Sequence, residues 1–327
     1  MNAAFNPAAY PPGSKHAVEL PLHGAAHGWN LPILLVRGSA PGKRLVVTAA
    51  VHGDEFEGVR AILDLYGQLD PSQMSGDFLS VPVANPPAFW SKSRTSPVDG
   101  LNLAREFPGS LERSCTSAIA YSLVHSIISH ADFYLDLHSA GIHLNMPRLV
   151  GYNARDRRAH EAALVFGSRV LWAHYGGGAG RTVSFAAELG IPYLYTEAQG
   201  GGRIDPEDLR FYKQGVLNLL RHLKILPGEA TATPVELHLE GAGDIDSGIR
   251  SSAQGFFIPH VKLLEQVSAG AQLGYLSNLQ GEPIERYHSP AGGVVALIRA
   301  VPVVQPGDML FHITGVLNGE ALESQFR

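Results

Sequence analysis

The chain is poor in cysteine and contains neither a basic run nor a long apolar run. Its 327 residues include one cysteine, Cys115, so no disulfide can form within the chain, which fits a reducing cytoplasm. The formal net charge is −5 and lysine and arginine form no block, so we expect neither nucleic acid nor an anionic membrane as a partner. The N-terminus does not resemble a secretory signal, and no apolar stretch could span a bilayer. We therefore expect a cytoplasmic protein.

Histidine is the residue type present in unusual number. Hydrophobic residues make up 45% of the chain, which is typical of a globular protein rather than a disordered one. The length favours two domains over one. Most of the 15 histidines are expected at the surface or in packing positions. The question is whether a few of them gather at one site.

Strand and helix patterns alternate through the first two thirds of the chain. Continuous apolar runs indicate buried strands, and apolar residues at helical spacing indicate amphipathic helices. The expected strands lie at 44–51, 78–89, 132–141 and 191–202, and the expected helices at 56–69, 119–128, 157–174 and 205–226. Asp205 is the expected N-cap of the last helix, and Pro206 occupies its first position. This alternation predicts an α/β domain with a mostly parallel or mixed sheet.

The pattern changes near residues 227–228. Beyond this point the segments are short, alternating and separated by turns, which predicts a small all-β domain at 229–327 after an α/β domain at 1–228. Residues 289–313 resemble the hairpins of a biotinyl/lipoyl-type barrel-sandwich, but their turn lacks the exposed lysine that would carry the cofactor. The second domain is therefore expected to be structural or a lid, and not a carrier.

Polar residues follow three of the apolar runs at the point where each run ends. They form the sequences "HGDE" from His52, "DLH" from Asp136 and "TE" ending at Glu197. In open α/β sheets, ligands bind in the crevice beyond the carboxyl ends of the strands. The three polar ends therefore predict one converging site.

His52, Glu55 and His138 could bind one metal ion. Three such ligands leave a fourth position open for water, as in catalytic zinc sites, whereas structural zinc closes four positions, often with thiolates. The alternatives are a helix start that places acids at the positive end of the dipole, and a hydrogen-bonded core histidine at His138. The joint placement favours one zinc ion per chain. Asp54 and Glu57 would then only face solvent or the helix dipole.

The order "HGDE", "DLHSAG" and "TEAQGG" resembles the succinylglutamate desuccinylase/aspartoacylase family, a branch of the zinc carboxypeptidase-like fold. The resemblance extends over most of the chain, including the C-terminal β segment. It implies an α/β/α domain with a mixed sheet and zinc bound by His52, Glu55 and His138. It also implies that Glu197 is the general base that activates the metal-bound water. Asp136 precedes His138 by two residues on the same strand face, so we expect it to be a buried polar support and not a ligand.

The segment "NPPAFWSKSRTSPVDGLNLAREFPG", from Asn85 to Gly109, is similar to another part of the family's pattern. The resemblance implies that Arg94 polarises the scissile carbonyl and that Arg105 binds a substrate carboxylate. The family's Asn before that arginine is replaced by Ala104, and Asn102 aligns with the usual Asp, so half of the carboxylate clamp is changed. Arg181 is a second candidate anion contact by its position after a glycine run, with a solvated loop arginine as the alternative.

The expected activity is hydrolysis of the amide bond of a small N-acyl amino acid or related N-acyl amine. One alternative is a zinc carboxypeptidase acting on C-terminal peptide bonds, which Ala104 disfavours. Another is a metal-binding protein without turnover, against which Glu197 counts. The acyl group, the amine half and α-carboxylate recognition stay open, as does the oligomeric state, including a homo-oligomer.

Overall fold

Strands alternate with helices along most of the chain, as the sequence pattern predicts. The computed structural model describes residues 5–176, 178–231, 233–241 and 247–317. The α-helices in this part are α1 (Glu57–Gln68), α2 (Pro86–Ser91), α3 (Cys115–Ser126), α4 (Arg157–Phe166), α5 (Thr182–Glu188) and α6 (Pro206–His222). The strands of the first two thirds are β1 (Ser14–Pro21), β2 (Asn30–Arg37), β3 (Ala40–Ala49), β4 (Ser75–Val81), β5 (Phe133–Ser139), β6 (Leu144–Asn145), β7 (Leu149–Asn153), β8 (Val170–His174) and β9 (Tyr193–Ala198).

The remaining described strands are short and follow one another without an intervening α-helix. They are β10 (Leu237–Glu240), β11 (Ile249–Arg250), β12 (Gly255–Pro259), β13 (Gln266–Val267), β14 (Gln272–Ser277), β15 (Pro283–His288), β16 (Gly293–Arg299), β17 (Val303–Val304) and β18 (Met309–Val316). None of the helices in the described part of the chain is long and apolar enough to cross a membrane.

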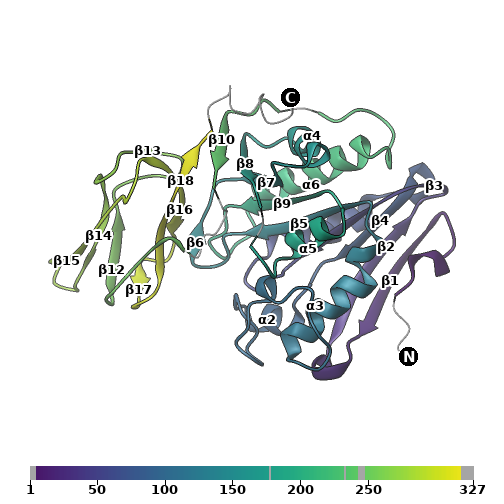
Figure 1. Cartoon of the computed structure of the whole chain (residues 1–327), viewed down its shortest axis with the longest axis horizontal. Helices are drawn as coiled ribbons and strands as arrows, with labels where there is room; N and C mark the ends of the chain where they lie inside the picture. The colour runs from purple at the N-terminus through teal and green to yellow at the C-terminus, as the bar shows by residue number, and fades with distance from the viewer. Residues whose placement is uncertain (1–4, 177, 232, 242–246, 318–327) are drawn as a thin grey trace.

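A large mixed sheet runs through the molecule (Figure 1). In the described residues its order is β1-β2-β4-β3-β5-β9-β7-β8-β10-β18-β16-β13, with β6 and β11 beside this path. β3, β5 and β9 are parallel neighbours, whereas β1 and β2 form an antiparallel edge. The carboxyl ends of β3, β5 and β9 therefore lie at the same edge of the sheet, where ligands bind in open α/β sheets.

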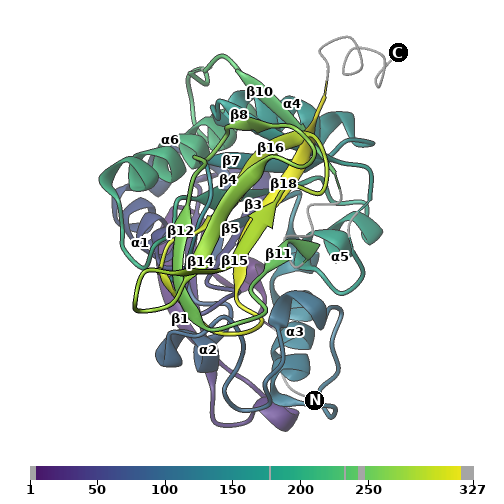
Figure 2. The ribbon, with the colours of Figure 1, turned by 90° about the vertical axis from the view of Figure 1, so that its left-hand side faces the viewer.

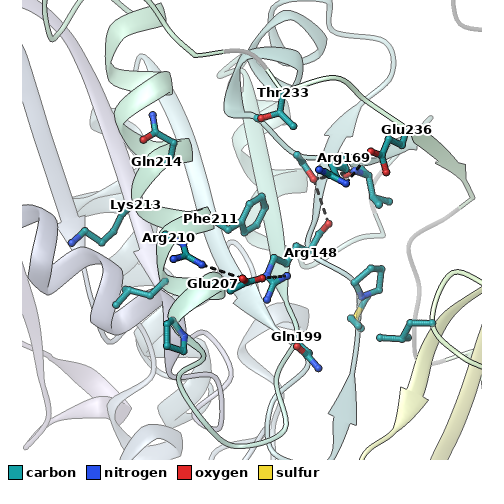
Figure 3. Close-up of a pocket in the computed structure, with 18 of the residues that line it drawn as sticks. Arg148, Arg169, Gln199, Glu207, Arg210, Phe211, Lys213, Gln214, Thr233 and Glu236 are labelled. Carbon is teal, nitrogen blue, oxygen red and sulfur yellow. Dashed lines mark hydrogen bonds and ion pairs between the residues drawn. The ribbon is translucent and has the colours of Figure 1, made fainter.

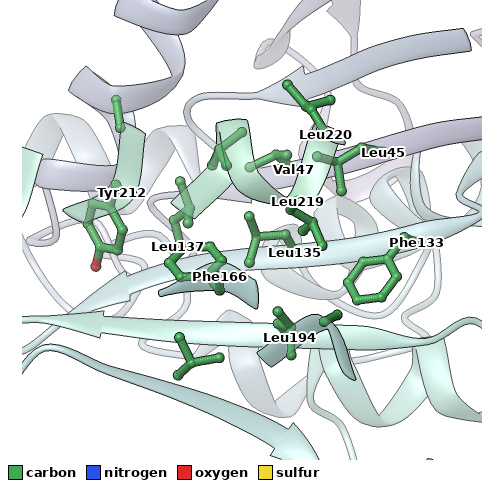
Figure 4. Close-up of a cluster of buried hydrophobic side chains, with 14 of the residues drawn as sticks. Leu45, Val47, Phe133, Leu135, Leu137, Phe166, Leu194, Tyr212, Leu219 and Leu220 are labelled. Atoms are coloured by element: carbon green, nitrogen blue, oxygen red, sulfur yellow. The ribbon is translucent and has the colours of Figure 1, made fainter. Parts of the chain in front are cut away.

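Helices cover both faces of this sheet, which confirms the predicted α/β/α layers. One core packs α1, α4 and α6 against the sheet, and it contains Phe133, Leu135 and Leu137 of β5 (Figure 4). The other core packs α3 and α5 against the opposite face and contains Tyr134. Because side chains alternate along a strand, Asp136 and His138 share the α3/α5 face with Tyr134. The helices thus determine to which side the polar end of β5 points.

The expected helix at 157–174 is wrong in its second half. α4 ends at Phe166, because Gly167 adopts a left-handed conformation with φ of 96° at the C-cap. The chain then forms β8 from Val170 to His174, which pairs parallel with β7. The last helix agrees with its prediction, since Pro206 begins α6 and the Asp205 side chain caps it by accepting from the Glu207 backbone N–H at 2.8 Å.

The C-terminal strands continue the large sheet and add a second one (Figure 2). β10 pairs parallel with β8, and β18 pairs antiparallel with β10. β15, β14, β12 and β17 form a separate antiparallel sheet, and a third apolar core lies in this part of the chain, with Phe257, Leu276, Val295 and Phe311 among its members. The division of the chain at residue 228 stays a prediction, although β10 belongs to the large sheet.

Candidate active site

Two histidines and a glutamate meet where β3 and β5 end. The His52 Nδ1 lies 2.7 Å from Glu55 Oε1, and the His138 Nδ1 lies 3.0 Å from Glu55 Oε2. One donor atom from each of the three residues lies within 4.8 Å of the others. Each histidine thus turns the same ring nitrogen toward one carboxylate, which is a suitable arrangement for a metal ion.

The turn that carries His52 and Glu55 is folded tightly against α2. Ala50, the first residue after β3, adopts a positive φ of 50°, which is uncommon for a residue other than glycine. A Cβ atom on Gly53 would lie 2.0 Å from the Ala88 carbonyl carbon, so only glycine fits there. The "HGDE" sequence therefore owes its glycine to this close backbone approach, which fixes the position of both flanking side chains.

A buried aspartate holds the ring of His138. The His138 Nε2 lies 3.0 Å from Asp136 Oδ2, two residues earlier on the same face of β5. Asp136 is itself fully buried and accepts hydrogen bonds from the Thr48 hydroxyl, at 2.6 Å, and from the Thr182 hydroxyl. The Tyr212 hydroxyl donates to the His138 backbone carbonyl. Carboxylates that orient a ligating histidine in this way tune metal binding.

The electrostatics of this group favour a positive charge beside Glu55. Burial alone would lower the pKa of His138, but Asp136 and Glu55 raise it well above the ordinary value. Burial likewise would raise the pKa of Glu55, but the two histidines hold it well below the usual range. Burial, with the nearby Arg94 charge, lowers the pKa of His52 to about 4, so its ring is neutral near pH 7. A neutral imidazole is the form that binds a metal.

Glu197 lies beside His138 on the adjacent strand, β9. β5 and β9 pair in parallel with His138 opposite Glu197. In the described structure the Glu197 Oε2 and the His52 Nε2 are buried without a hydrogen-bond partner. Burial raises the pKa of Glu197 to about 8. A buried polar atom without a partner is costly, so both atoms indicate that the site receives a ligand or water.

One cavity of about 70 Å³ brings most of the predicted site residues together. Its walls include His52, Arg94, Ala104, Arg105, His138, Met146, Trp172, Arg181, Thr182, Val183, Tyr195 and Glu197. The Arg94 Nη1 lies 3.7 Å from Glu55 Oε1, which ties this arginine to the His-Glu-His group. Arg105 and Arg181 come from separate loops and line the same space. The cavity thus combines three guanidinium groups with the buried Glu197.

Asn102 occupies a different position from the other predicted site residues. It is the N-cap of a short 3₁₀ turn at Leu103–Arg105, and its Oδ1 accepts from the Ala104 backbone N–H at 2.9 Å. It is absent from the cavity walls in the described part of the chain. A direct contact between Asn102 and substrate stays a prediction, while its observed contact supports the turn that carries Arg105.

The expectation that Asp54 and Glu57 face solvent or the helix dipole holds only in part, because neither faces solvent, whereas Glu57 lies in the first turn of α1, at the positive end of the helix dipole. Both are buried, with 8% and 2% of their surface exposed. Asp54 Oδ2 accepts from the Ile142 backbone N–H at 3.3 Å, and Glu57 Oε2 accepts from the Ser139 hydroxyl at 2.6 Å. Ser139 is the last residue of β5 and Ile142 lies in the loop after it, so both contacts come from a segment far away in sequence, which the local pattern could not indicate. The two hydrogen bonds connect the segment that begins at Asp54 to the end of β5 and the loop that follows it.

Trp172 and Tyr195 line the cavity and were missed from the sequence. Trp172 lies in β8, the segment that the helical pattern had assigned to a helix. Tyr195 lies two residues before Glu197 in β9, so its strand position already placed it on the same face. The two-residue spacing between Tyr195 and Glu197 could therefore have identified Tyr195 as a site residue.

A second, larger cavity lies between α6 and the loop before β8 (Figure 3). Its volume is about 1080 Å³, and it shares Met146 with the smaller cavity. Several of its charges are paired within its own walls: Arg148 Nη1 lies 3.4 Å from Glu207 Oε2, and Arg169 Nη1 lies 3.0 Å from Glu236 Oε1. These pairs leave it without the concentrated charge of the smaller cavity.

Asp136→Asn is expected to weaken metal binding by about 10- to 100-fold, because the amide cannot supply the negative charge that orients His138. Competition against a chelator of known affinity measures the change. Asp77→Asn is the matched control, since Asp77 is also buried but pairs with Arg44 on the neighbouring strands. Equal metal affinity in Asp136→Asn and the wild type would contradict the role given to Asp136.

The α/β/α fold and the His-Glu-His group at the ends of its parallel strands define the class of metallohydrolase-like proteins. Residues 41–223 match the family model of the succinylglutamate desuccinylase/aspartoacylase catalytic domain. The chain belongs to this family, as the sequence resemblance implied. A metallopeptidase-type structure from Shewanella denitrificans, 14% identical with a TM-score of 0.51 over 64% of this chain and 84% of that one, shares the fold alone.

Three relatives resemble the chain over almost its whole length. The N-α-acetyl-L-2,4-diaminobutyric acid deacetylase of Halomonas elongata is 30% identical over 319 residues, which cover 93% of this chain and 92% of the relative. A succinylglutamate desuccinylase structure from Silicibacter sp. TM1040 has a TM-score of 0.83 at 27% identity, covering 94% and 97% of the two chains. The product-bound ectoine utilization protein EutE from Ruegeria pomeroyi has a TM-score of 0.83 at 26% identity, with the same coverage.

Proposed function

We propose that the protein is a zinc-dependent amidohydrolase that removes the acyl group from a small N-acyl amino acid or related N-acyl amine. One observation carries this proposal: the His52, Glu55 and His138 group lies in the same small site as Glu197, whose Oε2 is buried without a partner. Three protein ligands beside a potential general base are typical of a catalytic metal site. A structural metal site would have a fourth protein ligand.

Zinc suits the donor set, because two imidazoles and one carboxylate are typical ligands of catalytic zinc. His52 and His138 would bind through Nδ1, the atom that each turns toward Glu55. When bound, the ion lowers the pKa of a water molecule and polarises the amide carbonyl. Asp136 keeps the His138 ring in place from the opposite nitrogen.

Glu197 supplies the proton transfers. Its Oε2 faces the site without a partner, so it can take a proton from the attacking water and hand it to the leaving amine. A raised pKa, about 8 through burial, makes both steps feasible near neutral pH. Arg94, 3.7 Å from Glu55, is placed to stabilise the negative oxygen that develops on the carbonyl.

Arg105 and Arg181 are the candidate contacts for a carboxylate on the substrate. A guanidinium group binds a carboxylate through two parallel hydrogen bonds, and both arginines line the cavity. The Halomonas relative is named for an N-acetylated diamino acid, so such a compound is the first substrate to test. The small cavity and the Ala104 replacement disfavour a carboxypeptidase that accepts long peptides.

The test is a substrate panel with the zinc-loaded protein. N-acetyl, N-formyl and N-succinyl amino acids, N-α-acetyl-L-2,4-diaminobutyrate and short peptides are assayed for release of a free amine, with chelator-treated protein as the control. We expect turnover of at least one N-acyl amino acid and its loss on chelation. Turnover of peptides alone, or equal turnover after the metal has been removed, would overturn the proposal.

A further inference from the structure

A buried histidine fixes the direction of the Tyr195 hydroxyl at the wall of the cavity. The His174 Nδ1 lies 2.7 Å from the Gly241 backbone carbonyl, and the His174 Nε2 lies 2.6 Å from the Tyr195 hydroxyl. His174 has only 5% of its surface exposed. A carbonyl oxygen only accepts, so the His174 Nδ1 must carry a proton and donate it.

The other nitrogen of His174 is therefore an acceptor while the ring is neutral. Burial lowers the pKa of His174 to about 4, and the nearby Arg181 charge acts in the same direction. With Nδ1 protonated and the ring neutral, Nε2 accepts, and the Tyr195 hydroxyl must donate its one proton to it. The Tyr195 oxygen then has only lone pairs left, and it can only accept a hydrogen bond from the cavity.

The backbone keeps Tyr195 in this position. Tyr195 and Trp172 both lie opposite Gly151, on the strands that flank β7. A Cβ atom on Gly151 would lie 1.9 Å from the Tyr195 Cε1, so the absence of a side chain there allows the ring to lean across β7 toward His174. The His174 and Tyr195 rings stack, with centroids 5.5 Å apart. Tyr195 is thus held by packing on one side and a hydrogen bond on the other.

The charged groups of the cavity indicate which substrate group could donate a hydrogen bond to the Tyr195 oxygen. Arg94, Arg105 and Arg181 line the cavity and attract the carboxylate of a substrate, whereas they repel an ammonium group. Tyr195 and Trp172 line the same cavity and offer an acceptor oxygen and an aromatic surface, both of which favour an ammonium group. The cavity therefore suits a substrate that carries a carboxylate and a second, free amino group.

We propose that Tyr195 is a specificity-determining residue that accepts a hydrogen bond from a free amino group on the amine half of the substrate, and that His174 is the positioning residue that imposes this role. The inference rests on the proposed function, because it concerns the substrate of the same site. The hydrogen bond to Tyr195 would favour an N-acyl diamino acid over the corresponding N-acyl monoamino acid, which lacks the second amino group.

The experiment compares two substrates that differ only in that amino group, N-α-acetyl-L-2,4-diaminobutyrate and N-acetyl-L-2-aminobutyrate. We expect the wild type to favour the first, and Tyr195→Phe to reduce the ratio of the two kcat/KM values by about tenfold or more, mainly through KM. Tyr193→Phe is the matched control, because Tyr193 is buried on the same face of β9 but outside the cavity walls in the described structure. It should leave the ratio unchanged.

His174→Phe tests the positioning role separately. The phenylalanine ring can still stack on Tyr195 but cannot accept its proton, so the hydroxyl becomes free to donate into the cavity. The same ratio should fall in this variant, whereas a purely structural role would lower both kcat/KM values together. Circular dichroism and metal content establish that each variant is folded.

Calorimetry of product binding gives a readout that does not depend on turnover. L-2,4-diaminobutyrate should bind more weakly to Tyr195→Phe than to the wild type, while the affinity for L-2-aminobutyrate should change less. An unchanged preference in Tyr195→Phe, in turnover and in product binding, overturns the inference and leaves the proposed function standing. Failure of the wild type to hydrolyse any N-acyl substrate overturns the proposed function, and the calorimetric comparison then still decides the role of Tyr195.

Discussion

Glu197→Gln is expected to reduce hydrolysis by about 10²- to 10⁴-fold while the protein keeps its full metal content. The amide has nearly the same shape as the carboxylate but cannot take a proton from water. Glu197 also lies outside the His-Glu-His group, so the three ligand atoms stay in place. Single-turnover rates, with metal content measured on the same preparation, test both halves of the prediction.

A second buried acid provides the control for Glu197→Gln. Glu57 is buried and accepts a hydrogen bond from Ser139, but it lies outside the cavity walls in the described part of the chain. Glu57→Gln should therefore change kcat by less than about tenfold, since its neutral amide can still accept from the hydroxyl. If Glu197→Gln retained wild-type turnover, another group would have to be the base.

The convergence of three strand ends was predictable from the sequence because parallel strands bring their carboxyl ends to one edge. His52, Glu55, His138 and Glu197 each follow or end an apolar run, and the parallel register of β3, β5 and β9 places them together. The side to which His138 and Glu197 point also follows from the alternation along β5 and β9, whereas His52 and Glu55 lie in the turn after β3. Local patterns thus contained most of what defines the ligand group.

The error at 157–174 has a local cause. Apolar residues continue from α4 into Val170–His174, so helical spacing alone extended the helix. Gly167 was the signal against this extension, because glycine at the C-cap commonly ends a helix. Because of this error, Trp172 and His174 were assigned to a helix and were not expected beside the cavity, whereas they lie in β8.

Other features depend on contacts between distant segments and could not be read from local patterns. Asp54 is buried and contacts Ile142 in the loop after β5, and Glu57 is buried and contacts Ser139 at the end of β5. The orientation of the Tyr195 hydroxyl depends on His174 and on the carbonyl of Gly241. These residues lie far apart in sequence, and their types alone do not indicate that they meet.

Replacement of His52 or His138, the two proposed histidine ligands, by alanine is expected to reduce bound metal to below about one tenth of the wild-type content and to abolish hydrolysis, because two remaining ligands bind zinc weakly. The two variants should differ in stability without metal. His52→Ala leaves Glu55 paired with His138, whereas His138→Ala leaves Asp136 and Glu55 without the histidine that lies between them. Loss of one partner from a buried ion pair costs about 3–5 kcal/mol, so His138→Ala should be the less stable variant.

The stability of metal-free His138→Ala should also depend on pH in a definite direction. In the wild type, His138 helps to hold the pKa of Asp136 and of Glu55 below their ordinary values. The two ionised acids therefore stabilise the folded protein at pH values above the ordinary pKa of a carboxyl group. Without His138, burial raises the folded-state pKa of one or both acids, and the folded protein then binds more protons than the unfolded chain. His138 itself has a raised pKa, so it makes the wild type more stable as pH falls to about 6, just below the ordinary histidine value, and adds little further below that. The stability of His138→Ala relative to the wild type should therefore increase as pH falls from about 6 toward 5.

Urea unfolding of the metal-free wild type and His138→Ala at about pH 6 and about pH 5 tests this difference. His27→Ala is the control, because His27 is exposed and should leave metal content and pH dependence unchanged. If His138→Ala lost stability on acidification in parallel with the wild type, the two carboxylates would not be coupled through His138. If it kept one metal ion per chain, His138 would not be a ligand, and the assignment of the whole group would fail with it.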